Sequence, residues 1–239
     1  MALRIATNWV LAPALGFTLG VCTFLEPWPP ADDQGLGTIT LKRPLAHQRL
    51  DILDQIHQHP EFRSLVANRH VARWHQSEKI PHAHRDYHVA QGLLYGPGHL
   101  EIDPLVFHDE NTKELIVFYH LGPNLGNENN RVHKGVLALL LDEALCYCGF
   151  PSLPNKRGVT ARLSIDYARD VPVDSTVVLR AHVHEASGRK CVIKGTLETL
   201  PAKRWWNPLG RETSTVLASA TCILVEPKWF KYVTWFNAF

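Results

Sequence analysis

The sequence predicts an α+β fold in which a curved antiparallel sheet wraps around one central apolar helix. Residues 136–150 form a nearly continuous apolar run of helix length, and strand-like runs lie on both sides of it. The runs after the helix are separated by short turns, which is typical of hairpins and not of parallel strands joined by crossover helices. An antiparallel sheet around one buried helix accounts for this order of elements.

Residues 1–30 differ in composition from the rest of the chain. No charged residue interrupts the run from Asn8 to Leu25, Arg4 precedes it, and Glu26 and three prolines follow it. That pattern fits a tilted membrane span, a signal-peptide core or a mitochondrial presequence. We therefore expect a membrane anchor or targeting segment, and a membrane-associated protein of the mitochondrion or the endomembrane system. An apolar arm packed on the domain is disfavoured, because proline and glycine within the run make a poor soluble helix.

Residues 31–102 predict a linker followed by an N-terminal extension that is partly helical and partly irregular. Residues 31–47 contain the acidic and glycine residues of a linker. Apolar residues recur at three- and four-residue spacing from Pro44 to His75, and Pro60 interrupts them, so two short helices are expected. Residues 76–102 are rich in His, Gly and Pro, which indicates an irregular segment.

Residues 103–239 predict the main domain. The runs PLVFHD and ELIVFYHL flank the polar tetrapeptide ENTK, which is the pattern of a hairpin. The apolar run that follows has no β-branched residue after Val136, so a buried helix is favoured over a strand, and the run is too short to span a membrane comfortably. Three further strands are expected at residues 175–185, 190–200 and 214–226, with a loop around Trp205 before the last.

The strand expected directly after the helix, at residues 159–167, alternates strictly between apolar and polar residues. Leu163 and Ile165 occupy odd positions, whereas Thr160 and Ser164 occupy even positions. A period of two places the odd positions on one face of a strand and the even positions on the other. The pattern therefore predicts a strand with its odd-numbered side chains buried.

Composition excludes several classes of function. The formal net charge is +2 and the basic residues form no stripe, so no nucleic-acid partner is expected. The five cysteines lie mostly in apolar runs without the paired spacing of zinc sites, and His82, His84 and His88 have no acid or cysteine at ligand spacing. We therefore expect reduced cysteines and no metal site. The chain also lacks the Gly-x-Ser-x-Gly motif of serine thioesterases.

Two adjacent carboxylates, Asp142 and Glu143, interrupt the apolar helix. A carboxylate in such surroundings costs several kcal/mol unless it is paired, hydrogen-bonded or protonated. Adjacent helical residues point about 100° apart, so we expect only one of the two to enter any given cleft. The sequence leaves two interpretations open: a catalytic carboxylate, or a structural one at a subunit interface or satisfied within the core.

The residues before this helix predict a site for negative charge. Asn127, His133, Lys134 and Gly135 precede or begin it. The backbone N–H groups of the first turn of a helix have no intrahelical acceptor, and the positive end of the helix dipole lies behind them. Such a helix start can accept a developing oxyanion.

Three segments of the sequence, VHKGVLALLLDEAL, KRGVTARLSIDYARDVP and ASGRKCVIKGTLETL, resemble the hotdog thioesterase superfamily. The resemblance is strongest to mitochondrial and fungal acyl-CoA thioesterase-like members that carry an HGG motif before the central helix, and it covers about Leu105 to Lys228. It implies a hotdog fold for residues 103–239, a homodimer or dimer of dimers, and no cofactor.

The resemblance also implies roles for individual residues. Asp142 would be the general base or nucleophile, and the backbone N–H of Lys134 would bind the thioester carbonyl. The hydroxyl of Thr160 would position the water, His133 is the motif histidine, and Asn127 matches a polar position upstream of the motif.

One departure from the family pattern lies at the residue nearest the chemistry. The HGG motif is altered to His133-Lys134-Gly135, so the first glycine is replaced by a lysine. Glycine allows a close backbone approach, whereas lysine keeps the N–H but adds a long cation. Hydrolysis could be weakened, the substrate changed, or another reaction of a thioester or β-keto compound catalysed.

The leading prediction is hydrolysis of an acyl thioester carried by coenzyme A or by a carrier protein, with Asp142 of one chain acting beside His133 and Lys134 of the other. One alternative keeps the fold but makes the protein a lyase, dehydratase or cyclase of a biosynthetic pathway, in which the carboxylate removes a proton. A second alternative is a catalytically inert, membrane-tethered scaffold. Hydrolysis of a thioester panel would separate the first two, and an unaltered phenotype of Asp142→Asn would support the third.

Overall fold

The computed structural model describes residues 48–80, 88–201 and 213–230. Its helices and strands lie in one compact unit, residues 38–227, while the other unit, residues 1–37 with 228–239, falls almost wholly outside the described residues. The expected anchor or targeting segment, the linker, His82, His84 and the loop around Trp205 also lie outside them.

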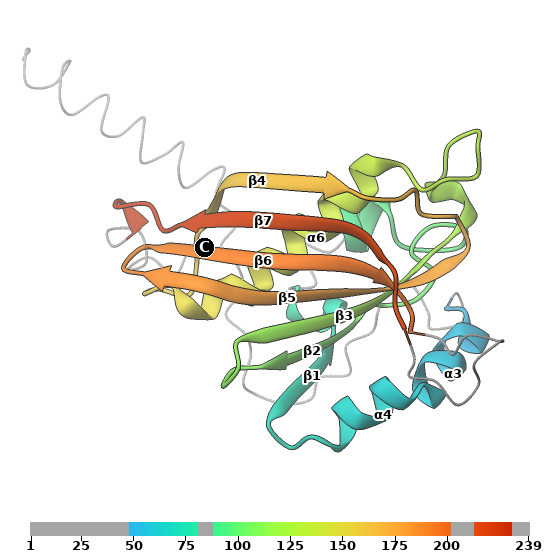
Figure 1. The fold of residues 1–239 in the computed structure, drawn as a ribbon, viewed down its shortest axis with the longest axis horizontal. Coiled ribbons are helices and arrows are strands. Elements are labelled where there is room, and N and C mark those ends of the chain that lie inside the picture. The colour runs from blue at the N-terminus through green and yellow to red at the C-terminus, as the bar shows by residue number, and fades with distance from the viewer. Residues whose placement is uncertain (1–47, 81–87, 202–212, 231–239) are drawn as a thin grey trace, which may run out of the picture. The chain divides into compact units, whose positions relative to one another are not determined.

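In the described part of the chain, seven antiparallel strands form one sheet in the order β1-β2-β3-β5-β6-β7-β4, with β1 and β4 as its outer strands (Figure 1). The expected hairpin before the helix and the four expected strands after it are all present. The strands are β1 (Val71–His75), β2 (Leu105–Asp109), β3 (Glu114–Leu121), β4 (Val159–Tyr167), β5 (Ser175–Ser187), β6 (Lys190–Thr199) and β7 (Val216–Val225).

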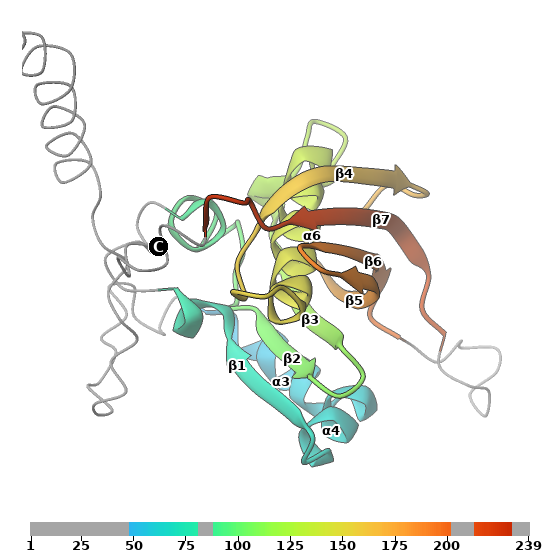
Figure 2. The same ribbon diagram turned by 90° about the vertical axis from the view of Figure 1, so that its left-hand side faces the viewer.

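The central helix α6 (Lys134–Gly149) packs against β3, β4, β5, β6 and β7, and the sheet curves around it (Figures 1 and 2). Leu140, Leu141 and Leu145 are fully buried in the core between helix and sheet. Among the described residues, the helical stretch Lys134–Ser152 is long and apolar enough to span a membrane, but here it forms the core of the domain. A curved antiparallel sheet around one central helix is the hotdog fold that the sequence resemblance implies.

Two helices of the extension, α3 (Leu50–Gln58) and α4 (Pro60–Ala67), cover the opposite face of the sheet near β2, β3 and β5. Ile56 and Phe62 pack there with Phe107, Phe118 and Val178. Because successive strand residues point to opposite faces, neighbouring positions of these three strands belong to the core around α6. The two predicted helices therefore exist, and they bury a face of the sheet that would otherwise be apolar and exposed.

The prediction of helical structure as far as His75 is wrong at its end. Val71–His75 forms β1, which pairs with β2 in antiparallel register from Val71 opposite Asp109 to His75 opposite Leu105. The helical spacing of the apolar residues is a local signal, and strand pairing with distant residues overrides it. In the described part of the segment 76–102, the helical structure is limited to two short turns, Gln76–Lys79 (η3) and Val89–Leu93 (η4). Two further short turns, Pro123–Leu125 (η5) and Phe150–Ser152 (η6), lie elsewhere in the chain.

Candidate active site

The carboxylate of Asp142 lies on the side of α6 that faces β4. Its Oδ1 accepts a hydrogen bond from the Thr160 hydroxyl at 3.0 Å. Asp142 is half-buried and Thr160 is exposed, so solvent or a ligand can reach the pair. The structure therefore brings two of the predicted site residues into direct contact. They lie on α6 and β4 and are 18 residues apart in the chain.

A β-bulge in β4 turns Thr160 toward the helix. Thr160 pairs with Leu224 of β7, but the next register pair joins Arg162 to Ile223, so Ala161 is an extra residue. Strict alternation from Leu163, which is half-buried against the core, would have pointed Thr160 away from α6. The extra residue turns Thr160 back toward the helix. The sequence pattern alone placed Thr160 on the wrong face of the strand.

Glu143 points into different surroundings from Asp142, as the 100° rotation between adjacent helical residues requires. Its Oε2 accepts a hydrogen bond from Gln76 Nε2 at 2.9 Å, and its Oε1 lies 3.7 Å from His88 Nε2. Burial raises the pKa of Glu143 to about 7, and the nearby charge of Asp142 adds to the rise. Glu143 is thus a carboxyl held by the N-terminal extension, on another side of the helix from Thr160.

The N-terminus of α6 is capped by His133. Its Nδ1 accepts a hydrogen bond from the backbone N–H of Gly135 at 3.1 Å. A Cβ at position 135 would lie 2.9 Å from this nitrogen, so the glycine makes room for the imidazole cap. Within the described part of the chain the N–H of Lys134 is bonded to no acceptor, which leaves it free to bind a carbonyl oxygen.

The side chain of Lys134 lies against β4. Its Nζ is 5.3 Å from the ring centroid of Tyr167, and the Tyr167 hydroxyl donates to the backbone carbonyl of Lys134 at 3.1 Å. The ammonium group therefore lies over the face of an aromatic ring, where the ring's negative face attracts it. The lysine that replaces the first glycine of the motif thus has a defined position beside the helix start.

Asn127 holds the loop that precedes the helix. Its Oδ1 accepts hydrogen bonds from the backbone N–H groups of Asn129 at 3.0 Å and of Arg131 at 3.1 Å. The loop forms one wall of a hollow of about 400 Å³ at the start of α6. The hollow is lined by Asn127, Asn129, Arg131, Val132, His133, Lys134 and Asp170, of which only Asn127, His133 and Lys134 were predicted from the sequence.

The predicted site residues thus fall into two groups within one chain. Asp142 and Thr160 form the first group, and Asn127, His133, Lys134 and Gly135 form the second. Lys134 and Asp142 are eight positions apart on α6, which corresponds to about 12 Å along the helix axis. One chain does not bring the carboxylate and the helix start to a single reacting carbonyl.

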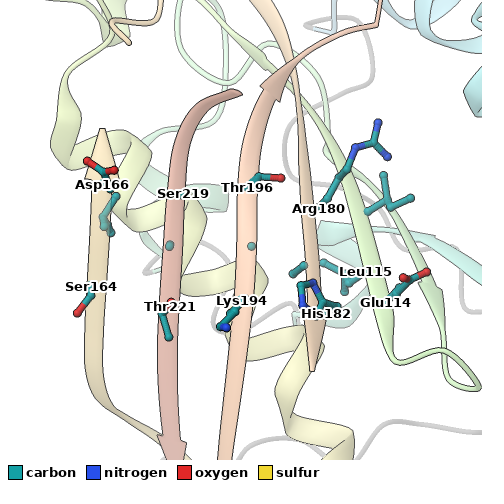
Figure 3. A pocket seen from close by; sticks show the side chains of 15 residues that line it. Glu114, Leu115, Ser164, Asp166, Arg180, His182, Lys194, Thr196, Ser219 and Thr221 are labelled. Atoms are coloured by element: carbon teal, nitrogen blue, oxygen red, sulfur yellow. The ribbon is translucent and has the colours of Figure 1, made fainter. Parts of the chain in front are cut away.

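A wider hollow of about 760 Å³ lies on the sheet face opposite α6 (Figure 3). Side chains such as Asp166, Arg180, Lys194 and Thr221 line it, and they come from β4, β5, β6 and β7. None of the predicted site residues lines this hollow, and the sheet separates it from α6. The hollow is therefore not part of the candidate active site, although it is the larger of the two.

Two cysteines that the sequence suggested were only packing residues lie beside Asp142. Cys146 Sγ is 3.3 Å from Thr160 Oγ1 and 4.0 Å from Asp142 Oδ1, and Cys222 on β7 completes the cluster. The spacing of Asp142 and Cys146, four residues apart on one helix face, was visible in the sequence. Cys222 could not have been found in this way, because only the sheet brings β7 to the helix.

The comparisons with known proteins agree with this architecture. A profile of the thioesterase superfamily matches residues 129–203. MIOREX complex component 3 of Saccharomyces cerevisiae is 48% identical over 263 residues, which cover 99% of this chain and 97% of that protein. A protein of Candida albicans, described only as uncharacterized and mitochondrial, is 43% identical, with 93% of this chain and 94% of that protein covered.

A more distant relative carries the name of an enzyme. Acyl-coenzyme A thioesterase THEM4 of Rattus norvegicus is 27% identical over 100 residues, which cover 41% of each chain. The similarity to the two fungal proteins extends over nearly the whole chain, whereas the profile covers the central helix and the strands β4, β5 and β6. This chain belongs to the thioesterase superfamily.

Proposed function

We propose that the protein hydrolyses an acyl thioester, carried by coenzyme A or by a carrier protein, with Asp142 as the essential carboxylate. The observation that carries this proposal is the 3.0 Å hydrogen bond between the Asp142 carboxylate and the Thr160 hydroxyl at a solvent-accessible side of the helix. Membership of the thioesterase superfamily and the name of the rat relative support the same substrate class.

In the proposed reaction, Thr160 and Asp142 hold a water molecule against the thioester carbonyl. Asp142 takes a proton from the water, and the water oxygen attacks the carbonyl carbon. The N–H of Lys134, at the positive end of α6, stabilises the oxyanion of the tetrahedral intermediate. The intermediate then collapses, the C–S bond breaks, and the thiolate leaves and takes up a proton. Direct attack by the carboxylate, followed by hydrolysis of the resulting anhydride, uses the same residues.

The separation of about 12 Å between the two groups of residues favours a site shared between two chains. β4 is an outer strand of the sheet, and it lies beside both groups: Thr160 near one end contacts Asp142, and Tyr167 at the other end contacts Lys134. Antiparallel pairing of β4 with the same strand of a second chain would therefore bring Asp142 of one protomer toward Lys134 of its partner. We propose a homodimer of this kind.

The protein is further proposed to act in mitochondria, associated with a membrane through residues 1–30. A close relative from Candida albicans is described as mitochondrial. The uncharged run from Asn8 to Leu25 has the composition of an anchor or a targeting segment. Fractionation of the tagged full-length chain, followed by carbonate extraction, distinguishes an anchored protein from an imported soluble one.

The function is tested by offering the purified protein acyl-CoAs of graded length and following thiol release. Asp142→Asn should abolish hydrolysis, because the amide keeps the shape of the carboxylate but cannot act as base or nucleophile. Glu143→Gln is the matched control, since it changes the neighbouring carboxylate in the same way, and it should retain most of the activity. Equal losses in the two variants, or no hydrolysis of any thioester by the unaltered protein, would contradict the proposal.

A further inference from the structure

Two thiols and one carboxylate converge between α6 and β7. One ligand atom from each of Asp142, Cys146 and Cys222 lies within 4.8 Å of the others. The Thr160 hydroxyl is next to them, 3.0 Å from the Asp142 carboxylate and 3.3 Å from the Cys146 sulfur. The proposed hydrolysis uses the carboxylate and the hydroxyl but neither of the thiols.

The fold fixes the positions of these groups. Asp142 and Cys146 are four residues apart on α6, so their side chains lie one turn apart on the same helix face. Cys222 lies opposite Leu163 of β4 and Ile193 of β6 in the sheet, and it is completely buried against the helix. Two elements, α6 and β7, therefore hold the three ligands, with Asp142 and Cys146 half-buried on the open side of the cluster.

The distances are close to those of a tetrahedral metal site. With Zn–S bonds of about 2.3 Å and Zn–O bonds of about 2.0–2.2 Å, two ligand atoms of a tetrahedral site lie roughly 3.3–3.8 Å apart. The Cys146 sulfur is 4.0 Å from the Asp142 carboxylate and 3.3 Å from the Thr160 oxygen. The three ligand atoms lie within 4.8 Å of one another, so side-chain shifts of up to about 1 Å would bring them to tetrahedral separations.

A second cluster of potential ligands in the described residues, Glu101, His120 and Asp174, differs in its charge balance. Arg49 Nη1 lies 3.3 Å from the Glu101 carboxylate and 3.5 Å from the Asp174 carboxylate. The guanidinium group already supplies the positive charge there, so the cluster is an ion-pair network. The cluster around Asp142 has soft thiol ligands, which favour zinc-like metals over magnesium or calcium.

We propose that Asp142, Cys146 and Cys222 form a binding site for a thiophilic divalent cation of the Zn²⁺ class, with Thr160 or a water molecule as the fourth ligand. Binding replaces the protons of both thiols, which pass to solvent, and gives two metal–sulfur bonds and one metal–carboxylate bond. Because Asp142 is then a metal ligand, it can no longer accept a proton from water. The bound cation therefore inhibits hydrolysis, a consequence that rests on the proposed function.

Binding is measured without reference to activity. The reduced, metal-free full-length protein, carrying Cys22→Ser to remove the cysteine outside the described residues, is titrated with Co²⁺. A thiolate-to-cobalt charge-transfer band should appear with one equivalent of metal, and Zn²⁺ should abolish it by displacement. Co²⁺ that is bound elsewhere by histidines alone gives no such band, so the band reports Co²⁺ bound by cysteine thiolates.

Matched variants locate the site. Cys222→Ala and Cys146→Ala should each weaken Zn²⁺ binding at least about a hundredfold, since even the loss of an outer-sphere partner costs roughly 10–100-fold. Cys191→Ala removes another buried thiol and should leave binding unchanged. Cys222→Ser is the second substitution if Cys222→Ala fails to fold, as judged by its melting curve.

The outcomes are distinct. The site is refuted if no charge-transfer band appears, or if the band survives both cysteine substitutions. It is also refuted if Cys146 and Cys222 form a disulfide that resists reduction, which a mass lower by two hydrogens would reveal in protein isolated without reductant. Metal binding with the expected variant profile supports it, even if no thioester is hydrolysed, in which case only the proposed function fails. Hydrolysis that persists at saturating Zn²⁺ would overturn the inhibitory role.

Discussion

Asp142 and Glu143 are neighbours in the sequence, but their environments give them different chemistry. Asp142 contacts the Thr160 hydroxyl on an accessible side of α6. Glu143 accepts a hydrogen bond from Gln76 and has a pKa raised to about 7 by burial. Asp142, which meets an exposed hydroxyl, is the better candidate for reaction with a substrate. Glu143, which the N-terminal extension holds, is the better candidate for a structural role.

The contribution of Thr160 to turnover can be measured by removing its hydroxyl. Thr160→Val keeps the branched shape but loses the hydrogen bond to Asp142. We expect kcat to fall about ten- to hundredfold, because a hydrogen bond to a charged group contributes about 1.5–3 kcal/mol and about 1.4 kcal/mol corresponds to a factor of ten. Thr160→Ser restores the hydroxyl and should recover most of kcat. An unchanged kcat in the valine variant would remove Thr160 from the site.

The raised pKa of Glu143 predicts a pH dependence of stability. The pKa is about 7 in the folded protein against the ordinary value of 4.5, so the folded state binds this proton more tightly than the unfolded state. The stabilisation is complete below about pH 4.5 and is lost as the pH rises through about 7. Over that range the free energy of unfolding should fall relative to Glu143→Gln, by about 3 kcal/mol at most.

The measurement is denaturant unfolding of both proteins between pH 4.5 and 8. His88, whose pKa is lowered by burial, is present in both proteins, so the difference between them isolates the carboxyl. Glu110→Gln, at an exposed position, is the control and should run parallel to the unaltered protein. Parallel curves for Glu143→Gln would show that Glu143 titrates normally.

At the scale of the elements, the start of α6 combines a structural cap with a candidate oxyanion site. Gly135→Ala places a Cβ 2.9 Å from His133 Nδ1, so the imidazole must move. Loss of the cap costs about 0.5–2 kcal/mol, and alanine in place of glycine within a helix returns about 1 kcal/mol. We therefore expect a nearly unchanged free energy of unfolding but a lower kcat/KM, measured by thermal unfolding and by thioester hydrolysis.

His133→Asn is the comparison for this variant. Asparagine is a good N-cap residue, so it keeps the helix start while it removes the imidazole. If both substitutions lower kcat/KM with intact stability, the histidine matters for the reaction as well as for the cap. If Gly135→Ala is as active as the unaltered protein, the position of the imidazole is irrelevant to turnover.

At the scale of the whole molecule, a site shared between two chains predicts complementation. Asp142→Asn and His133→Ala should each be inactive or nearly so when prepared alone. In a mixed dimer one of the two shared sites contains both defects, and the other contains an intact Asp142 with an intact His133. Random mixing gives half mixed dimers with half of their sites intact, so about one quarter of the original activity should return.

The experiment uses co-refolding or co-expression of the two variants, followed by hydrolysis assays and sedimentation. The control is a mixture of Asp142→Asn with Thr160→Val. Those two residues belong to the same group within one chain, so every shared site of the mixed dimer contains a defect. Equal activity of the two mixtures, or a monomeric protein, would place the whole site within one chain.

The sequence by itself determined the central helix and the strands around it. The unbroken apolar run required burial, and the period-two runs with short turns required an antiparallel sheet, because both patterns act locally. The positions of Asp142 and of His133-Lys134-Gly135 on that helix were also readable, since helix geometry alone relates them. The superfamily was identified by the resemblance of three sequence segments, and the family profile confirms it.

Tertiary structure alone decided the features that depend on pairing between distant segments. Val71–His75 pairs with β2 and so forms a strand. Thr160 turns toward Asp142 at a bulge in the pairing of β4 with β7. Cys222 joined Cys146 beside the carboxylate only when the sheet brought β7 onto the helix. Periodicity records which face of a segment is apolar, but it carries no information about which other segment will meet that face.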